Sequence, residues 1–315
     1  MAYETGSAIN PADLLDKLSV FAVANGFTLD ALRLESGRQT LYLNKNGEFY
    51  SMQFIPSTST QNSYIQINLA TGFVSGATFG LQPNSNATLA ANTRCHVNHV
   101  LNEAIPTYHF AYLDGGILTV VMLMATGNYA TFGFGEIEKY APFTGGGIVL
   151  GTMLEADSNK DHPEANTNVY YATNAGTTIN RRTWLHAEVD GIYMWQGYQG
   201  QPSPISGTAG YFDMSAAATY RTNYQVHSLI NGFTGAARTA PVTIFLKRKD
   251  GLNKATPLGY LRDVRLFNMR DFDPGATFDS DWLVFPGSVK GDPFSTGNPT
   301  DFFNSGWYGF AIRIQ

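Results

Sequence analysis

The chain has one cysteine, Cys95, and few charged residues. A single cysteine excludes an internal disulfide, and it excludes a zinc site built from cysteines. Charged residues make up 14% of the 315 residues, about half the share typical of soluble domains. The 20 lysines and arginines against 25 aspartates and glutamates leave a net charge of −5. This composition argues against nucleic-acid binding as the main function, because such binding needs clustered cations.

The sequence also lacks a long hydrophobic segment. Its most apolar stretch, residues 116–125 (GILTVVMLMA), is far shorter than the roughly 20 residues of a membrane-spanning helix. It follows an Asp-Gly-Gly turn signal, and we therefore predict a buried strand and no membrane insertion. The first residues, MAYETGSAIN, have neither the basic start nor the apolar run of a signal peptide, so we expect no export.

Glycine and aromatic residues are abundant, with 32 Gly, 21 Phe, 17 Tyr and 4 Trp, as is typical of a turn-rich β protein. One segment has helical periodicity. It begins with Asn10 as N-cap, Pro11 at the first helical position and Asp13 at the capping-box position, and Gly26 ends it. Four β-like runs follow, and an Asn46-Gly47 hairpin signal separates two of them. These runs are residues 27–34, 39–44, 47–54 and 63–69.

We therefore predict an N-terminal α+β domain over residues 1–105, in which residues 70–105 form a long, extended connection. Residues 106–315 predict a second, β-rich assembly domain that begins with a meander of three strands. Further strands are expected at residues 184–195, 241–251, 258–269 and 307–314, between long loops. The predicted fold is mainly β: an α+β unit with one clear helix, then an all-β sandwich- or barrel-like domain.

Candidate metal ligands are few. Cys95, His96 and His99 form a C-H-x-x-H pattern, which does not match the spacing of structural zinc sites, so they are weak candidates. His186 and Glu188 alternate with Asp190 and would share one strand face, but Asp190 is already explained by a turn signal. The acidic stretch 155–166 lacks the alternation of a calcium loop. We therefore expect no metal and no cofactor.

Motifs of catalysis are also missing. The chain has no G-x-S-x-G, no G-x-G-x-x-G and no phosphate-binding loop, so we expect that it is not an enzyme. Gly133-Phe134-Gly135 is predicted to allow close packing in an aromatic strand. A saccharide-binding or saccharide-cleaving groove stays open as an alternative, because its paired carboxylates come from distant positions. The basic residues of the C-terminal quarter are expected at a strand end or subunit contact: Lys247, Arg248, Lys249, Arg262, Arg265 and Arg270.

Three stretches carry a resemblance. They are MAYETGSAINPADLLDKLSVF (1–21), HFAYLDGGILTVVMLMATGNYATFGFGEIEKYAPFTGGGIVLGT (109–152), and LRDVRLFNMRDFDPGATFDSDWLVFP (261–286) followed by SGWYGFAIRI (305–314). Together they resemble a family of virion structural proteins of tailed bacteriophages. The residues that carry the likeness look like scaffold motifs for assembly: Gly133, Phe134, Gly135, Tyr140, Arg265, Asn268, Met269, Arg270, Pro274 and Trp282.

The resemblance implies a non-enzymatic structural subunit of the virion tail, made in the host cytoplasm and placed at the baseplate or tail tip. A neck or collar component at the head-tail junction is one alternative. A carbohydrate- or receptor-binding tail protein is another, in which Tyr193, Trp195 and Tyr198 would stack on a host glycan. The expected partners are other virion proteins and further copies in a symmetric ring. Low charge and many aromatics fit a subunit that neighbours bury on several sides.

Overall fold

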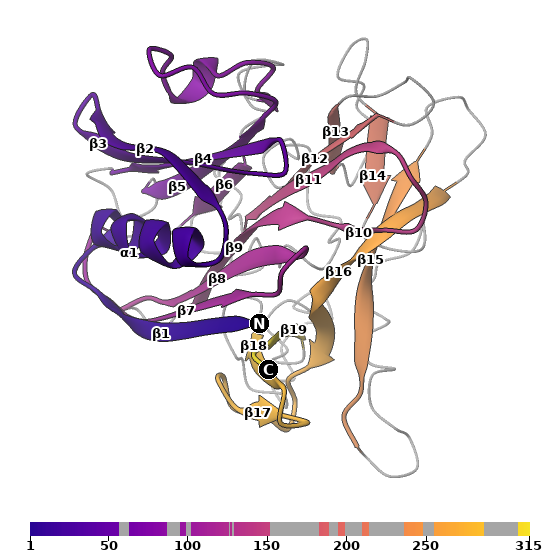
Figure 1. Cartoon of the computed structure of the whole chain (residues 1–315). Coiled ribbons are helices and arrows are strands. Elements are labelled where there is room, and N and C mark those ends of the chain that lie inside the picture. The colour runs from indigo at the N-terminus through magenta and orange to yellow at the C-terminus, as the bar shows by residue number, and fades with distance from the viewer. Residues whose placement is uncertain are drawn as a thin grey trace, which may run out of the picture.

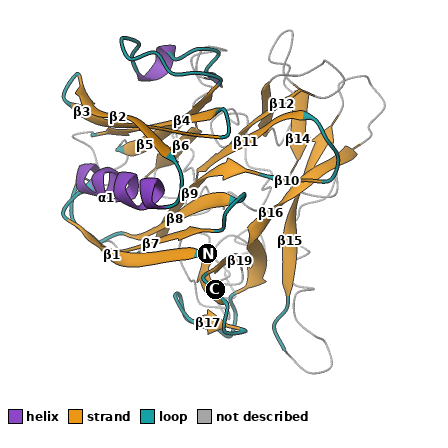
Figure 2. Cartoon of the chain, in the orientation of Figure 1, coloured by secondary structure: helices purple, strands orange, loops and turns teal. Residues whose placement is uncertain are grey.

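The structure, a computed structural model, shows a mainly β protein with a single α-helix in the part it describes (Figures 1 and 2). The described residues are 1–56, 63–86, 95–98, 102–125, 127, 129–151, 183–188, 195–198, 210–213, 236–247, 255–286 and 308–315. Within them, no helix is long and apolar enough to cross a membrane.

The helix α1 (Pro11–Ala24) begins where its capping residues predict. The Asn10 side chain accepts a hydrogen bond from the backbone N–H of Asp13 at 2.9 Å. The Asp13 carboxylate reaches back and accepts from the backbone N–H of Ile9 at 2.8 Å. The first bond satisfies a donor that the first helical turn leaves free, and the second holds the residue before the N-cap. The helix ends before Gly26, whose φ of +83° suits glycine.

A five-stranded antiparallel sheet follows the helix, in the order β2-β3-β4-β5-β6. Its strands are β2 (Thr28–Glu35), β3 (Arg38–Lys45), β4 (Glu48–Ile55), β5 (Tyr64–Ala70) and β6 (Cys95–Asn98). Asn46 and Gly47 join β3 to β4 with φ values of 54° and 84°, which confirms the predicted Asn-Gly hairpin.

The prediction of an extended connection over residues 70–105 is wrong for the described part. Residues 71–86 fold back onto the sheet, include the 3₁₀ helix η1 (Phe79–Leu81), and are held by side chains from β2. The Arg33 guanidinium donates to the carbonyl oxygens of Ser75 and Ala77, and the Glu35 carboxylate accepts from the backbone N–H of Phe79 at 2.9 Å. Partly buried polar side chains therefore fix a segment whose sequence has little periodicity.

The second sheet has 14 strands, in the order β1-β7-β8-β9-β11-β12-β13-β14-β15-β16-β19-β18-β17, and β10 pairs with β16. Its strands are β1 (Ala2–Ala8), β7 (Ile105–Tyr112), β8 (Ile117–Leu123), β9 (Tyr129–Glu136), β10 (Glu138–Lys139), β11 (Thr144–Gly151), β12 (Thr183–Glu188), β13 (Trp195–Tyr198), β14 (Gly210–Asp213), β15 (Thr239–Lys247), β16 (Ala255–Asn268), β17 (Thr277–Phe278), β18 (Trp282–Pro286) and β19 (Tyr308–Arg313). The meander β7-β8-β9 is confirmed, as is the buried strand at β8.

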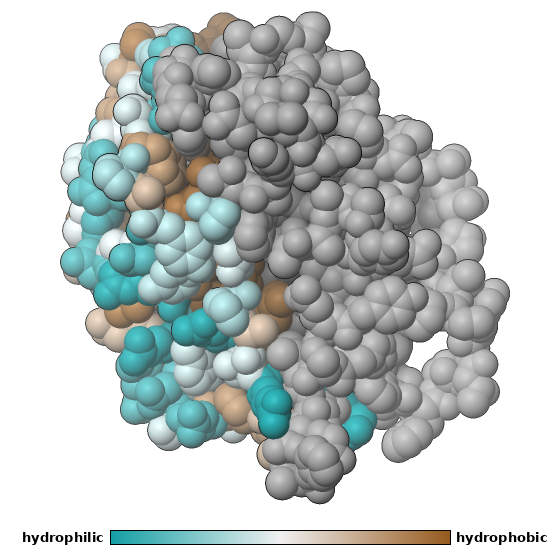
Figure 3. Space-filling view, turned by 90° about the vertical axis from the view of Figure 1, so that its right-hand side faces the viewer, coloured by the Kyte–Doolittle hydropathy of each residue, from teal (hydrophilic) through white to brown (hydrophobic). Residues whose placement is uncertain are grey.

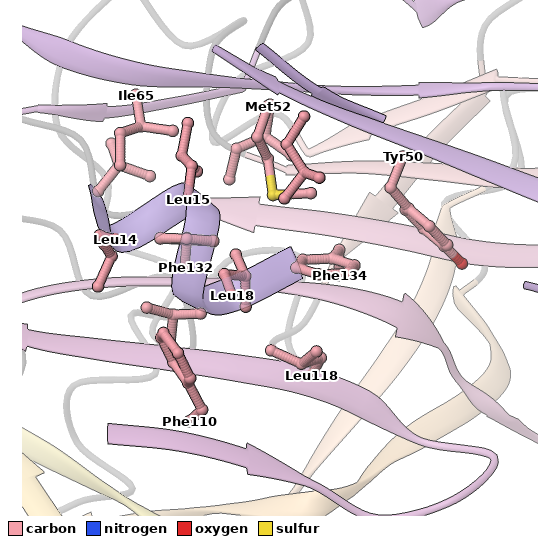
Figure 4. Packing of buried hydrophobic residues seen from close by; sticks show 14 of the residues in the cluster. Leu14, Leu15, Leu18, Tyr50, Met52, Ile65, Phe110, Leu118, Phe132 and Phe134 are labelled. Carbon is pink, nitrogen blue, oxygen red and sulfur yellow. The ribbon is translucent and has the colours of Figure 1, made fainter. Parts of the chain in front are cut away.

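The elements form three layers around two main cores (Figure 1). The first core lies between the helix and five-stranded sheet on one side and β7, β8, β9 and β11 on the other. Figure 4 shows Leu14, Leu15 and Leu18 of the helix between Met52 above and Phe110 below. The second core lies between the opposite face of β7–β12 and the C-terminal strands β15, β16, β18 and β19.

The fold class is thus confirmed as mainly β, and the large sheet does not close into a barrel in the described chain. Three strands depart from the order of the sequence: β10 pairs with β16, β19 lies between β16 and β18, and β1 pairs with β7. Ala2 lies opposite Tyr112, so the chain begins in the large sheet before it forms the helix. The division at residues 105 and 106 stays a prediction.

Candidate functional site

The β3–β4 hairpin extends from the five-stranded sheet onto the large sheet. The Lys45 ammonium donates to the Tyr112 hydroxyl at 2.6 Å and to the Asp114 carboxylate at 2.9 Å. The Asn46 amide donates to the Glu136 carboxylate at 2.7 Å. Consecutive residues of one turn therefore bind β7, the β7–β8 turn and β9. We call these hairpin residues, with Glu48 and Tyr50 of β4, the polar seam.

The second half of the polar seam is buried. Glu48 of β4 and His186 of β12 form a pair, with His186 Nδ1 at 2.8 Å from one carboxylate oxygen and 3.0 Å from the other. Their side chains are 6% and 12% exposed, so both partners are largely removed from water. The Tyr50 hydroxyl donates to the carbonyl oxygen of Gly135 at 3.0 Å. Gly147 makes room for the pair, since a Cβ there would lie 2.6 Å from a Glu48 oxygen.

Electrostatics keep the donors of the seam protonated. Burial works against the charge of Lys45, but its hydrogen bonds to Tyr112 and Asp114 raise its pKa above the ordinary value. The same ammonium lowers the pKa of Asp114. Burial, with the nearby carboxylates of Glu48 and Glu136, raises the pKa of Tyr50 well above its usual range. Lys45 and Tyr50 therefore keep their protons near neutral pH and act in the polar seam as fixed hydrogen-bond donors.

The β7–β8 turn is also held from the C-terminal layer. Arg262 of β16 donates to the carbonyl oxygen of Asp114 at 3.3 Å and lies 3.4 Å from the Glu138 carboxylate. Beside it, the Asp263 carboxylate is buried, and backbone hydrogen bonds link it to Leu113 and Ile117. One of its oxygens, Oδ1, has no partner among the described residues. Burial raises the pKa of Asp263 to about 7.

The predicted scaffold residues of the central stretch lie in this region. Phe134 of β9 is fully buried, and its ring centroid lies 5.3 Å from that of Tyr50. Gly133 and Gly135 flank it, and Gly135 has a φ of 147° and runs so close to the carbonyl of Gly116 that a Cβ would clash. This is the close backbone approach that the sequence predicts.

Tyr140 lies apart from the seam, beyond β10. It is 53% exposed, and its ring stacks on that of Tyr260 with the centroids 5.6 Å apart. An exposed pair of aromatic rings of this kind can serve as a contact surface, because Tyr is enriched at protein interfaces.

The scaffold residues of the third stretch build a separate, small core on the face of β16, β18 and β19 that points away from the second core. The buried Asn268 side chain accepts from the backbone N–H of Arg270 at 3.0 Å. The Met269 side chain fills the space that Gly309 leaves on β19. Pro274 lies in a turn that the bond from the backbone N–H of Ala276 to Asp273 closes at 3.0 Å. This cluster also contains Phe267, Val284, Ala311, Phe272 and Phe278.

The two arginines of this stretch have partners within the chain. The Arg265 guanidinium lies over the ring of Trp282, 5.8 Å from its centroid. Arg270 forms a paired contact with the neighbouring Asp271, at 2.7 Å for the shortest bond. Contacts of these arginines across a subunit interface stay a prediction.

The metal candidates are not gathered into a site in the described chain, which holds no group of three potential ligands. Cys95 is fully buried in β6, and burial raises the pKa of its thiol well above the ordinary value. His99 and the side chain of His96 lie outside the described residues, as does Asp190. The Glu48–His186 pair was not predicted, because 138 residues separate its members and no motif marks them.

Comparison with known proteins neither supports nor contradicts the resemblance to phage virion proteins. No family model matches the chain, and no curated protein matches it. The site must therefore be interpreted from its geometry. The polar seam and the β7–β8 turn tie three layers together through hydrogen bonds between side chains of distant segments, and this arrangement holds a shape.

Proposed function

We propose that the chain is a non-enzymatic structural subunit of a tailed-bacteriophage particle, located at the tail baseplate or tail tip. The supporting observation is the spatial convergence of the three stretches that resemble phage virion proteins. The first contributes β1, which pairs with β7 of the second. The second and third share a core in which Val121, Val264 and Ile312 are buried together.

The residues that carry the resemblance support this proposal by what they do locally. Gly135 permits a close strand contact, Met269 fills a core, and Asn268 fixes the backbone after β16. A particle subunit transmits load between neighbours and depends on a frame of this kind. The partners that we propose are other virion proteins and further copies of the chain in a symmetric ring. The net charge of −5 argues against nucleic acid as a partner.

Exposed hydrophobic side chains add to the support. Single exposed apolar residues are ordinary on a soluble protein. Among the residues that the structure describes, however, most of the large exposed ones belong to the N-terminal unit: Ile9, Val20, Val23, Leu29, Leu34, Val74 and Leu81. On the face shown in Figure 3, the described atoms are a mixture of hydrophilic and hydrophobic areas without one dominant patch. The N-terminal unit is therefore the part that we expect a neighbour to cover.

The test is immunogold electron microscopy of purified particles of the source phage, with mass spectrometry of the same preparation. Label at the distal end of the tail is the expected result. Label at the head-tail junction would place the chain in the neck or collar instead. Absence of the protein from both label and mass spectrum would refute a virion role.

Replacement of Arg265 or Arg270 by alanine tests the assembly motif. We expect incorporation into particles to fall more than solubility does, because neither side chain is part of the main cores. Arg238, which is exposed just before β15, supplies the control, and its alanine variant should be incorporated normally. Equal loss of solubility and incorporation would show that the arginines act in folding.

Receptor binding is the alternative function, and it makes a separate prediction. Tyr193 and the side chains of Trp195 and Tyr198 lie outside the described residues. If they stack on a host glycan, the purified chain should bind a glycan array and lose that binding in Trp195→Ala. A chain that labels the tail but binds no glycan would leave the structural role as the function.

A further inference from the structure

β2 is an edge of the five-stranded sheet in the described chain, and it carries three leucines on one face. Leu29 and Leu34 are 41% and 70% exposed, and Leu32 packs partly against the first core. An exposed edge strand with large apolar side chains is a template for pairing with another strand. Natural proteins usually protect such edges with charge. β2 also carries charged residues, but leucine lies one position in from each of its ends.

The three leucines share the sheet face that α1 covers. Their neighbours on β3 are Leu43, Leu41 and Gln39. Leu41 and Leu43 are buried in the core beneath the helix, and Gln39 donates to Asp16 of the helix at 2.6 Å. The exposed helical residues Val20 and Val23 follow Asp16 at intervals of four and three, so they continue the same stripe of α1.

The backbone of β2 is arranged to accept a partner at these leucines. Ser36 and Gly37 close the β2–β3 hairpin as a two-residue turn with φ values of 51° and 76°, and Glu35 lies opposite Arg38. In an antiparallel ladder, residues alternate between bonding to the neighbour and pointing away from it. Counted from the closing pair, Leu34 and then Leu32 direct their backbone N–H and C=O toward the open edge.

We propose that β2 pairs with β2 of a second copy of this chain, antiparallel about a two-fold axis at Leu32. A β-bulge makes Asp30 an extra residue between Leu29 and Ala31. Asp30 and Ala31 together therefore occupy one position of the ladder. In this register Leu34 lies opposite Leu29 of the second copy, and Arg33 lies opposite the bulge. All pairs keep the same face, because a two-fold axis perpendicular to a sheet preserves its faces.

Self-complementarity favours a second copy over an unrelated strand. Leucine meets leucine on the helix side, and the positive Arg33 meets the bulge that holds the negative Asp30 on the other side. Arg33 forms an ion pair with Glu35 of its own chain at 2.7 Å and donates to carbonyl oxygens there, so its attraction to Asp30 of the second copy contributes little affinity and serves the register. A register centred on Arg33 would place like charges opposite each other, which is destabilising.

This contact is isologous, since the same strand is used by both copies. It does not depend on the proposed place in a phage particle, because it joins chains in pairs whether or not they later enter a larger assembly. A failed particle assignment and a failed β2 contact are therefore separate outcomes.

Sedimentation velocity of the full chain over a concentration series tests the proposal. We expect the wild type to dimerise and Leu34→Asp to raise the dimer dissociation constant about tenfold or more, because each dimer loses two apolar contacts. Leu81→Asp is the matched control, since Leu81 is also 70% exposed but lies off β2. Circular dichroism should show that all three chains are folded. A monomeric wild type, or equal dimerisation by both variants, would overturn the proposal.

Cross-linking tests the register itself. The native Cys95 is buried, so introduced cysteines are the reactive ones. A mixture of Leu29→Cys chains with Leu34→Cys chains should be joined by a short bismaleimide, whereas each chain alone should not. Cross-linking of Leu34→Cys to itself at equal yield would contradict the axis at Leu32, and so would a mixture that does not react.

Discussion

The buried Asp263 makes a quantitative prediction about stability and pH. Its pKa rises from 3.8 to about 7 because burial disfavours the charged form, and the neighbouring Arg262 offsets little of that effect. At roughly 1.4 kcal/mol per pKa unit, the rise corresponds to about 4 kcal/mol. Between pH 3.8 and about 7, the Asp263 carboxyl is protonated in the folded chain and ionised in the unfolded chain. The contribution of Asp263 to stability is thus full below pH 3.8 and is lost as the pH rises to about 7.

Asp263→Asn should remove this dependence. Asparagine keeps the shape and still accepts the backbone hydrogen bonds, but its amide would stand where Oδ1 has no partner, at a cost of about 1 to 2 kcal/mol. We therefore expect the variant to be more stable than the wild type by about 2 kcal/mol at pH 8 and less stable at pH 4.

Urea unfolding of both chains between pH 4 and pH 8 measures the difference. Taking the difference cancels the titration of other groups. Asp16→Asn, which removes an exposed carboxylate, controls for the loss of a negative charge as such. Curves that stay parallel across this range would refute the reasoning, as would a variant that is less stable at pH 8.

Three further predictions concern buried positions. Gly147→Ala should destabilise the chain by about 2 kcal/mol in urea because its Cβ would press on Glu48, whereas Gly76→Ala, with open space around it, should change little. Burial lowers the pKa of His109 to about 4. The neutral imidazole therefore stabilises the folded chain above pH 6.5, and about 2 kcal/mol of that stability is lost as the pH falls to about 4, after allowance for partial exposure. His109→Gln should remove that loss, and an imidazole that titrates near 6.5 by NMR would contradict the prediction. The Cys95 thiol should react with a disulfide reagent at the rate of unfolding, and immediate labelling of the native chain would show that β6 is open.

The elements that the sequence predicts well are those whose signals are local. The start of α1 follows from Asn10 and Asp13, whose side chains cap the helix as their spacing indicates. The β3–β4 turn follows from Asn46-Gly47, and the meander follows from turn signals between apolar runs. Each of these depends on residues within a few positions of one another, so the pattern contains the information.

The contacts of the candidate site were not predictable in this way. Glu48 meets His186 across 138 positions, and Lys45 meets Asp114 across 69. A charged residue on a strand looks the same in sequence whether it faces water or a partner from another layer. The parallel pairing of β13 with β14 is a further case, since it requires a crossover through residues whose pattern gives no element.

The excess of glycine has an explanation that composition could not provide. Gly116 lies under the Asp263 carboxylate, Gly147 lies under Glu48, and Gly309 lies under Met269. In each case a Cβ would come within 3 Å of a side chain from a distant segment of the chain. Turn signals account for some glycines, such as Gly47 and Gly116, but Gly147 and Gly309 lie in the interior of strands, where glycine weakens a sheet. The contacts that these glycines allow between segments compensate for this cost. Substitutions at such glycines should therefore disrupt the packing between segments of this protein before they disrupt its individual strands.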